Sequence, residues 1–570
     1  MTSERLLFLG VLALFPLCAQ DAEYRITGSD APAAARAPVA LGYKLIGWND
    51  LGMHCFDGRD YSIFAVLPPF NTIHAHLLDP LGKLVKTGSG YTVSYQAISD
   101  PLTKSINTTS VGKTNFWQYA QQLGFGALQP DQGLKGSWMP GSKNTAQPMT
   151  FDPSDNTFIA VGIPITPYPD AGSPVSVNYF PMMRLTARNK SGAVIATTDI
   201  VLPVSDEMTC SVCHSSSKGT LAAQPAAGWV NASDPAKDVK LNILRKHDDR
   251  FASAPAFQSA VAKLAGYSTS GLETTAKTKP VLCDNCHASN ALGTPVVKDI
   301  QPLTTAMHSA HAGVTDPATG TAMDNGSTRD TCYRCHPGPD TKCLRGAMGS
   351  LKTAGGANAI ECQNCHGGMT AVAGAARNGW LDEPSCQSCH TGTAVRNNGS
   401  IVYTSVFTNG GTVRAAVDGT FATNPDTPAK GLSLYRFSTG HGGLQCESCH
   451  GSTHAEYSST VSNDNVQSAA LQGHAGVISE CTACHSSTPA TVNGGPHGMH
   501  PIGQSWVDGH QDAAERGGAA QCRNCHGVDF RGTLLSKAQG GRSFRTERGV
   551  KTFARGDVIG CYSCHNGPNP

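Results

Sequence analysis

The pattern C-x-x-C-H occurs nine times in this chain and takes up eighteen of its 21 cysteines. Two thiols at this spacing can bind covalently to one porphyrin, and the histidine that follows reaches its iron from the same side. We therefore expect nine attached haems of the c type. The cysteine pairs are Cys210/Cys213, Cys283/Cys286, Cys332/Cys335, Cys362/Cys365, Cys386/Cys389, Cys446/Cys449, Cys481/Cys484, Cys522/Cys525 and Cys561/Cys564, and the proximal histidines are His214, His287, His336, His366, His390, His450, His485, His526 and His565.

Zinc sites, redox-active cysteine pairs and disulfides are the competing interpretations of a C-x-x-C pair. A zinc site needs four ligands, which commonly come from two C-x-x-C pairs or from one pair with two spaced histidines. Neither zinc binding nor disulfide formation requires a histidine directly after every pair. The repeat therefore favours haem, and because this haem is attached outside the cytoplasm it also predicts an exported protein.

The composition agrees with a chain that folds around cofactors. Only 39% of the residues are hydrophobic and 7% are aromatic, whereas the chain has 62 glycines and 34 prolines. Such a chain builds a thin apolar core unless something else fills it. The formal net charge is +1, and no basic block exists that could neutralise phosphates, which argues against a nucleic-acid partner.

The first residues are typical of a secretory signal, predicted over 1–19 with cleavage after Ala19. Arg5 precedes a 12-residue apolar stretch, Leu6 to Leu17, which is too short to span a bilayer. An uncleaved anchor and lipidation of Cys18 are the alternatives. Residues 20–39 are interpreted as a linker.

The motif-free part of the chain, 40–205, is predicted to be a β-rich domain. Short β-branched or aromatic runs at 43–48, 62–67 and 157–163 are bounded by Gly, Pro and Asn, and two turns are expected near 80–82 and 189–192. Strands at this spacing suggest a β-sandwich, and helix signals are nearly absent there. The nine-haem domain would cover 206–570, which makes the fold class α+β.

Within 206–570 we expect sparse short helices and long loops. One helix is predicted from Pro235 to about His247, with Asp234 as its N-cap. Ile243 and Leu244 would share a face with His247, so that the helix could press on a porphyrin while the imidazole reaches the iron. The alternative is an ordinary amphipathic helix with a surface histidine. The motif-free insert 391–435 is interpreted as a hairpin or a surface loop.

The sixth ligand of each iron decides its role, since a second histidine closes the site and an open position admits a substrate. Twelve histidines remain outside the motifs, and nine of these lie in the haem region. We expect most of these nine to be distal ligands. In His308-x-x-His311 and His497-x-x-His500 both rings share one helix face, so each pair should serve two neighbouring haems. The nine candidates are His247, His308, His311, His441, His454, His474, His497, His500 and His510.

Two mature cysteines, Cys55 and Cys343, lie outside the motifs and could form a disulfide or stay free thiols. Together with Cys55, the histidines His54, His74 and His76 could ligate copper or zinc, because His74 and His76 would share a strand face. The alternative is that they are structural or surface histidines.

The motif density and three segments resemble the multihaem c-type cytochromes of metal-respiring bacteria. The segments are Gly440-His-Gly-Gly-Leu-Gln-Cys-Glu-Ser-Cys-His450-Gly-Ser-Thr-His454, Pro496-His-Gly-Met-His-Pro501 and Trp48-Asn-Asp-Leu-Gly-Met-His-Cys55. The resemblance implies electron transfer in the periplasm, at the outer membrane or outside the cell. It also implies redox-protein partners, acceptors such as metal oxides or electrodes, and in some cases outer-membrane or filament assembly.

The leading hypothesis is an electron carrier in which nine haems each have two histidine ligands, with no catalytic residues. The alternative is a multihaem oxidoreductase acting on nitrite, hydroxylamine or tetrathionate, which needs at least one open iron. All nine motifs end in histidine, and the distal candidates suffice for every iron, which favours the carrier. A third interpretation, compatible with the first, is that the β-rich domain docks the cytochrome to a partner.

Overall fold

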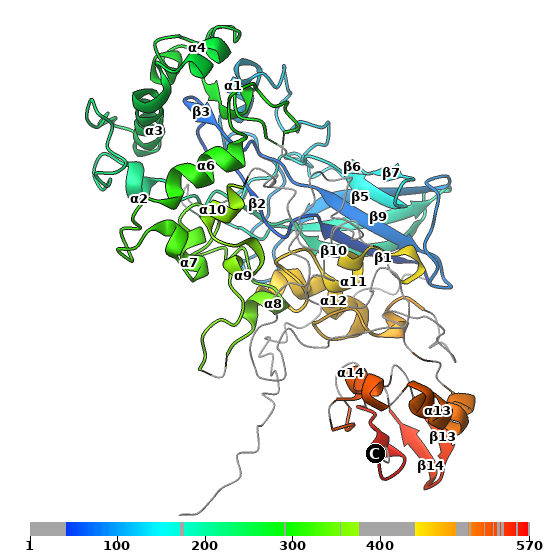
Figure 1. Cartoon of the computed structure of the whole chain (residues 1–570). Helices are drawn as coiled ribbons and strands as arrows, with labels where there is room; N and C mark the ends of the chain where they lie inside the picture. The colour runs from blue at the N-terminus through cyan, green and yellow to red at the C-terminus, as the bar shows by residue number, and fades with distance from the viewer. Residues whose placement is uncertain are drawn as a thin grey trace, which may run out of the picture.

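The computed structural model describes residues 42–171, 176–289, 292–353, 355–374, 439, 441–485, 500 and 503–567, the last range with gaps at 518, 528, 533–535, 537, 539–540 and 555–556. The signal peptide and linker predicted over 1–39, the fifth motif and the insert 391–435 lie outside these residues. The described residues contain both sheets and helices, which confirms an α+β composition (Figure 1).

Two four-stranded sheets form the N-terminal part of the structure. Their orders are β1-β4-β8-β7 and β10-β9-β5-β6. In the first sheet Trp48 pairs with His74, and in the second Leu185 pairs with both Thr198 and Tyr95. The strands are β1 (Lys44–Asn49), β4 (Ile73–Leu78), β5 (Tyr91–Ile98), β6 (Gln147–Pro148), β7 (Thr150–Asp152), β8 (Thr157–Ala160), β9 (Met182–Asn189) and β10 (Val194–Val201).

Side chains from both sheets enter one apolar cluster, because alternate strand residues point inward. Leu45 and Leu77 come from the first sheet, Tyr95 and Leu185 from the second, and all four are at most 1% exposed. The cluster also takes in one face of α1 (Phe116–Leu123), including Phe116. This helix was not foreseen from the sequence.

Both predicted turns are present. The Asn189 side chain accepts hydrogen bonds from the backbone of Ser191 and Ala193, which closes the β9–β10 hairpin at Gly192. Asp79 closes the other turn by accepting from the backbone of Lys83. The run at 62–67 differs from its prediction, since only β3 (Phe64–Ala65) is a strand and it pairs with β12 (Val281–Leu282) of the motif region.

The motif region consists of short helices joined by loops. The predicted helix at Pro235 is α3 (Pro235–Phe251), one turn longer than expected, and the Asp234 side chain caps it by accepting from Ala236 N and Lys237 N. Leu244 is 3% exposed in a cluster with Phe257, so the helix face that carries His247 is partly buried.

The other helices and turns of this region are mostly three to ten residues long. They are α2 (Ser211–His214), α4 (Pro255–Val261), α5 (Leu272–Thr275), η1 (Cys283–Asn285), α6 (Leu303–Ala312), η2 (Met323–Asn325), α7 (Arg329–Cys332), α8 (Ala347–Ser350), α9 (Cys362–His366), α10 (Met369–Val372), η6 (His441–Gly443), α11 (Cys446–His450), η7 (Ser462–Asn465), α12 (Val466–Gln472), η8 (Cys481–Ala483), α13 (Gln504–Gly517), η10 (Ala519–Cys522), α14 (Arg523–His526) and η12 (Cys561–Ser563). Short strands complete the fold as β2 (His54–Cys55), which pairs with β11 (Val204–Ser205), and a hairpin of β13 (Arg542–Thr546) and β14 (Gly549–Phe553). Among the described helices, none is both long and apolar enough to cross a membrane.

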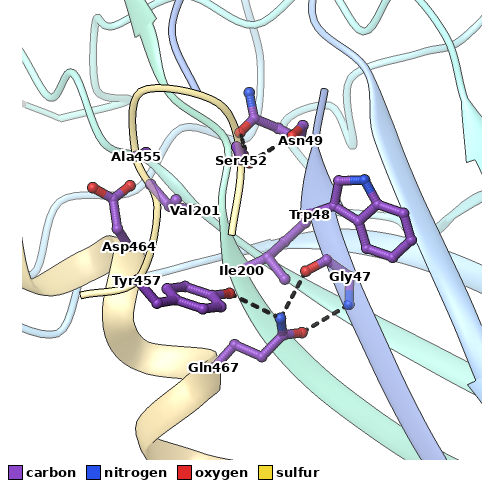
Figure 2. Close-up of a pocket in the computed structure, with 10 residues that line it drawn as sticks. All are labelled: Gly47, Trp48, Asn49, Ile200, Val201, Ser452, Ala455, Tyr457, Asp464 and Gln467. Atoms are coloured by element: carbon purple, nitrogen blue, oxygen red, sulfur yellow. Dashed lines mark hydrogen bonds between the residues drawn. The ribbon is translucent and has the colours of Figure 1, made fainter. Parts of the chain in front are cut away.

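Segment 452–467 packs on β1 and β10 of the N-terminal sheets. The Gln467 side chain exchanges two hydrogen bonds with the backbone of Gly47, at 2.7 and 2.8 Å, and also contacts Tyr457, as Figure 2 shows. The cavity that these residues line is about 20 Å³, enough for a single water molecule. It is far too small for a cofactor, so this junction joins the sheets to the motif region and is not itself a binding site.

Candidate haem-binding centres

Each described motif forms a single helical turn. In five motifs the histidine N–H donates to the carbonyl oxygen of the first cysteine, at 2.9–3.1 Å, as from His214 to Cys210. The motifs that begin at Cys362 and Cys446 lie wholly in the short helices α9 and α11, and α14 contains the end of the motif that begins at Cys522. Such a turn brings the two cysteines and the histidine of one motif close together.

Seven motif histidines face a second histidine at nearly constant separation. The distances between ring centres are 5.9–6.4 Å. In every pair the second ring is one of the distal candidates from the sequence. The pairs are His214–His311, His287–His247, His336–His308, His366–His454, His485–His441, His526–His500 and His565–His510.

This separation fits one metal ion between two rings. Metal–imidazole bonds of about 2 Å, plus about 1.15 Å from each nitrogen to its ring centre, separate the centres by roughly 6.3 Å. Rings in direct stacking contact would lie closer together. The residues present therefore fit an iron held between paired imidazoles, with the thiols of the same motif beside it.

The Nδ1 atoms of the paired histidines support the same arrangement. Seven of them lie 2.7–3.2 Å from a backbone carbonyl oxygen, and an Nδ1 that donates to this oxygen leaves Nε2 to bind a metal. Three examples are His308 with Thr304, His510 with Val507 and His526 with Ile559. The others are His287 with Gln301, His311 with Met307, His485 with Leu81 and His565 with Gly567.

Neutral imidazole is the form that binds metals. Loss of solvation, followed by neighbouring basic groups, lowers the pKa of His214, His336 and His454 to about 4, which favours that form. Burial also raises the pKa of most of the described motif thiols, such as Cys286, Cys449 and Cys522.

Cys365 differs from the other described motif cysteines in its exposure to solvent. The sequence gives all eighteen cysteines the same role, but the Cys365 side chain is exposed, whereas the other described motif cysteines are partly buried. Cys362 and Gln363, at the start of α9, contact Cys332 of the third motif and the backbone of Thr328. Haem attachment at Cys365 stays a prediction, and the structure places this thiol at the solvent-exposed end of α9.

Several motifs are neighbours in space. Cys332 is hydrogen-bonded to Cys362, which lowers the pKa of Cys332. The pKa of Cys335 is raised to about 12, first by burial and then by the charges of Cys210 and Cys213. The first, third and fourth motifs therefore lie next to one another.

Similar contacts join two further sets of motifs. Burial and then the charge of Cys449 raise the pKa of Cys484 to about 12, and burial and then Cys522 raise that of Cys561. The sixth motif is thus beside the seventh, and the eighth beside the ninth.

Helix α6 supplies rings to two motifs at once. His308 faces His336, and His311, three residues later on the same helix, faces His214. This is the arrangement that the i, i+3 spacing predicts. The same prediction for His497 and His500 cannot be compared with the structure, because His497 lies outside the described residues.

Two distal candidates remain, of which only His474 lies within the described residues. His474 is bound to Glu480, with 3.4 Å between Nε2 and the carboxylate, and its Nδ1 faces the carbonyl of Ala475. His497 is outside the described residues, as are Cys386, Cys389 and His390 of the fifth motif and the side chain of Cys525.

The histidines of the N-terminal sheets contact polar and aromatic side chains of the same region. His54 Nε2 lies 2.7 Å from Asp50 Oδ1, and Trp48 packs against both His74 and His76. His76 Nε2 accepts from the backbone of Gln445. Within the described ranges no group of three or more His, Cys, Asp or Glu side chains is arranged to hold a metal, so the copper or zinc alternative gains no support.

Cys55 and Cys343 are both free thiols in the structure, so the disulfide that they could form is not present. Burial, followed by the charge of Cys343, raises the pKa of Cys55. The sulfur of Cys343 instead faces a paired histidine, with 3.8 Å between Cys343 Sγ and His454 Nδ1.

No family model, no curated protein and no solved structure matches this chain.

Proposed function

We propose that the chain is an electron-transfer protein that holds nine covalently attached c-type haems, each with two histidine ligands. One observation carries the proposal. Seven motif histidines each face a second histidine at 5.9–6.4 Å, although these partners come from separate parts of the chain. An iron closed by two imidazoles exchanges electrons between its ferric and ferrous states and leaves no position for a substrate.

The protein supplies three things to such centres. The cysteines of each motif would anchor the porphyrin, the motif histidine and its partner would close the iron on both sides, and backbone carbonyls such as that of Thr304 would hold the rings in orientation. Helix α6 fixes two centres relative to each other because it carries both His308 and His311.

The division into a β-rich domain over 40–205 and a nine-haem domain over 206–570 is part of this proposal. So is export, to the periplasm, the outer membrane or the outside of the cell, with other redox proteins, metal oxides or electrodes as partners. The attachment motifs support export because this haem is joined to the chain outside the cytoplasm, and the apolar stretch near the N-terminus agrees with it.

The test is to measure haem content and low-temperature electron paramagnetic resonance on the oxidised, purified protein. Nine haems per chain and only low-spin ferric signals would support nine closed centres. A high-spin signal equal to one haem would contradict a carrier with every iron closed and favour the oxidoreductase, with nitrite, hydroxylamine and tetrathionate as the substrates to try. A content well below nine would refute the cofactor assignment itself.

The ring angles make the test sharper. The rings are steeply inclined, by 63–89°, in the pairs that contain His214, His287, His366 and His485. They are inclined by only 13–24° in the pairs that contain His336, His526 and His565. Steep ligand planes give highly anisotropic low-spin signals and near-parallel planes give ordinary rhombic ones, so both kinds should be present, and a spectrum with one kind alone would contradict the geometry.

A further inference from the structure

His454 is held differently from seven of the other paired histidines. Its Nδ1 faces the sulfur of Cys343 at 3.8 Å, whereas those seven rings have a backbone carbonyl oxygen at that position. If Nε2 binds the iron, Nδ1 carries the proton and donates it. A thiol sulfur is a weaker acceptor than a carbonyl oxygen.

The backbone around this contact is fixed on both sides. The carbonyl oxygen of His454 accepts from the N–H groups of Arg345 and Gly346, at 2.8 and 2.6 Å, and its own N–H donates to Glu456. His454 has a φ of +66°, in the left-handed region that non-glycine residues rarely adopt. These bonds hold the ring of His454 against the side chain of Cys343.

Gly346 is part of the same support. A Cβ at this position would lie 2.1 Å from the Glu456 carboxylate and 2.3 Å from its backbone nitrogen, so only glycine allows the two segments to approach this closely. The other ring of this pair is that of His366, which lies on α9. The two ring centres are 6.2 Å apart. Cys343 therefore lies directly behind one of the two imidazoles that close this centre.

We propose that Cys343 is a positioning residue that sets the reduction potential of the haem held by His366 and His454. The proposal rests on the proposed function, since it requires an iron between these rings. A strong acceptor at Nδ1 makes an imidazole more basic and stabilises the ferric state, which lowers the potential. The weak sulfur acceptor leaves this haem easier to reduce than it would be with a carbonyl.

The experiment compares the wild-type holoprotein with Cys343→Ala, Cys343→Ser and Cys55→Ser, by potentiometric titration followed by electron paramagnetic resonance. Cys343→Ala removes the acceptor and should raise the potential of a single low-spin signal. Cys343→Ser offers a stronger oxygen acceptor and should lower it. We expect at least a threefold change in the reduced-to-oxidised ratio of that haem at fixed potential, about 28 mV for one electron.

The control Cys55→Ser should leave every potential unchanged, because Cys55 does not face a paired histidine. A shift in this control as large as that in Cys343→Ala would overturn the proposal, since it would mean that Cys343 is held in a disulfide. Unchanged potentials in Cys343→Ala, or shifts of the same sign in the Ala and Ser variants, would also overturn it. Each of these results is interpreted only when the wild type holds nine haems. A wild type with fewer haems would instead refute the proposed function, so the two failures are distinguishable.

Discussion

Replacing Arg345 with methionine removes a fully buried charge at the junction between the N-terminal sheets and the motif region. The guanidinium forms a bidentate ion pair with Asp464, at 2.7 and 2.8 Å, and donates to the carbonyl of Gly52 at 2.7 Å. It also lies 4.9 Å from the ring centre of Phe180. The side chain of Arg345 is 0% exposed and that of Asp464 is 2% exposed.

In Arg345→Met, Asp464 keeps the hydroxyl of Ser459 as a partner but loses its counter-charge. A buried ion pair that loses one member costs about 3–5 kcal/mol, because the remaining charge stays out of water. We expect the free energy of unfolding of the holoprotein to fall by this amount. Urea denaturation followed by far-ultraviolet circular dichroism measures it.

Two further variants distinguish the buried charge from a general loss of an arginine. Arg184→Met breaks a bidentate pair with Asp199 in which the arginine is 47% exposed, so it should cost only about 0–1 kcal/mol. Arg345→Met combined with Asp464→Leu should recover most of the loss, since neither charge then remains buried. Equal losses in Arg345→Met and Arg184→Met, or a loss below about 1 kcal/mol in Arg345→Met, would refute this reasoning.

Three other outcomes follow from the structure. His247→Ala should open one iron and give a high-spin signal of one haem while haem content stays at nine; an all-low-spin spectrum would contradict the pairing with His287. Gly82→Ala would place a Cβ 2.5 Å from the His485 ring and should shift one low-spin signal. The control Gly192→Ala, also at positive φ but in open space, should shift none, and equal spectra of the two variants would contradict the contact. Burial raises the pKa of Asp57 to about 6 from an unfolded value near 3.9, so the folded state binds its proton more tightly and stability should fall as the pH rises from about 4 through 6. Denaturation across this range should show a flatter profile for Asp57→Asn, and an unchanged slope would count against a buried carboxyl.

The elements that the sequence predicted well are those with local causes. The cap at Asp234 and the turn at Asn189 depend on side chains that bond their own neighbouring backbone, so a few residues suffice to identify them. The same holds for the motif turns, in which the cysteine spacing is a property of five consecutive residues. Strand β3 was predicted too long, because its two residues pair with Val281 and Leu282, more than 200 positions away.

For the candidate distal histidines, too, only part of the arrangement could be predicted from the sequence. Their number could be counted from the sequence, but their partners could not, because each pairing is a tertiary contact. His311 faces the first motif rather than the nearer third one, and His474 binds Glu480 instead of facing a motif histidine. Cys343 also escaped prediction as a neighbour of His454, since nothing in its local sequence indicates which side chain it meets.

The exposure of Cys365 is a further feature that the motif alone could not reveal. Its five-residue sequence is of the same kind as that of the other motifs, so the sequence does not indicate that its second cysteine is exposed.

The histidine pairs also favour an order in which the loops between paired histidines close during folding. His247 and His287 both lie between His214 and His311, so one pair is nested inside the loop that the other encloses. The inner loop has roughly 40 residues and the outer roughly 100, and the shorter loop costs less entropy to close. If the proposed function holds, the first motif would thus be among the last to gain its second histidine, after the pair of His287 and His247 has formed.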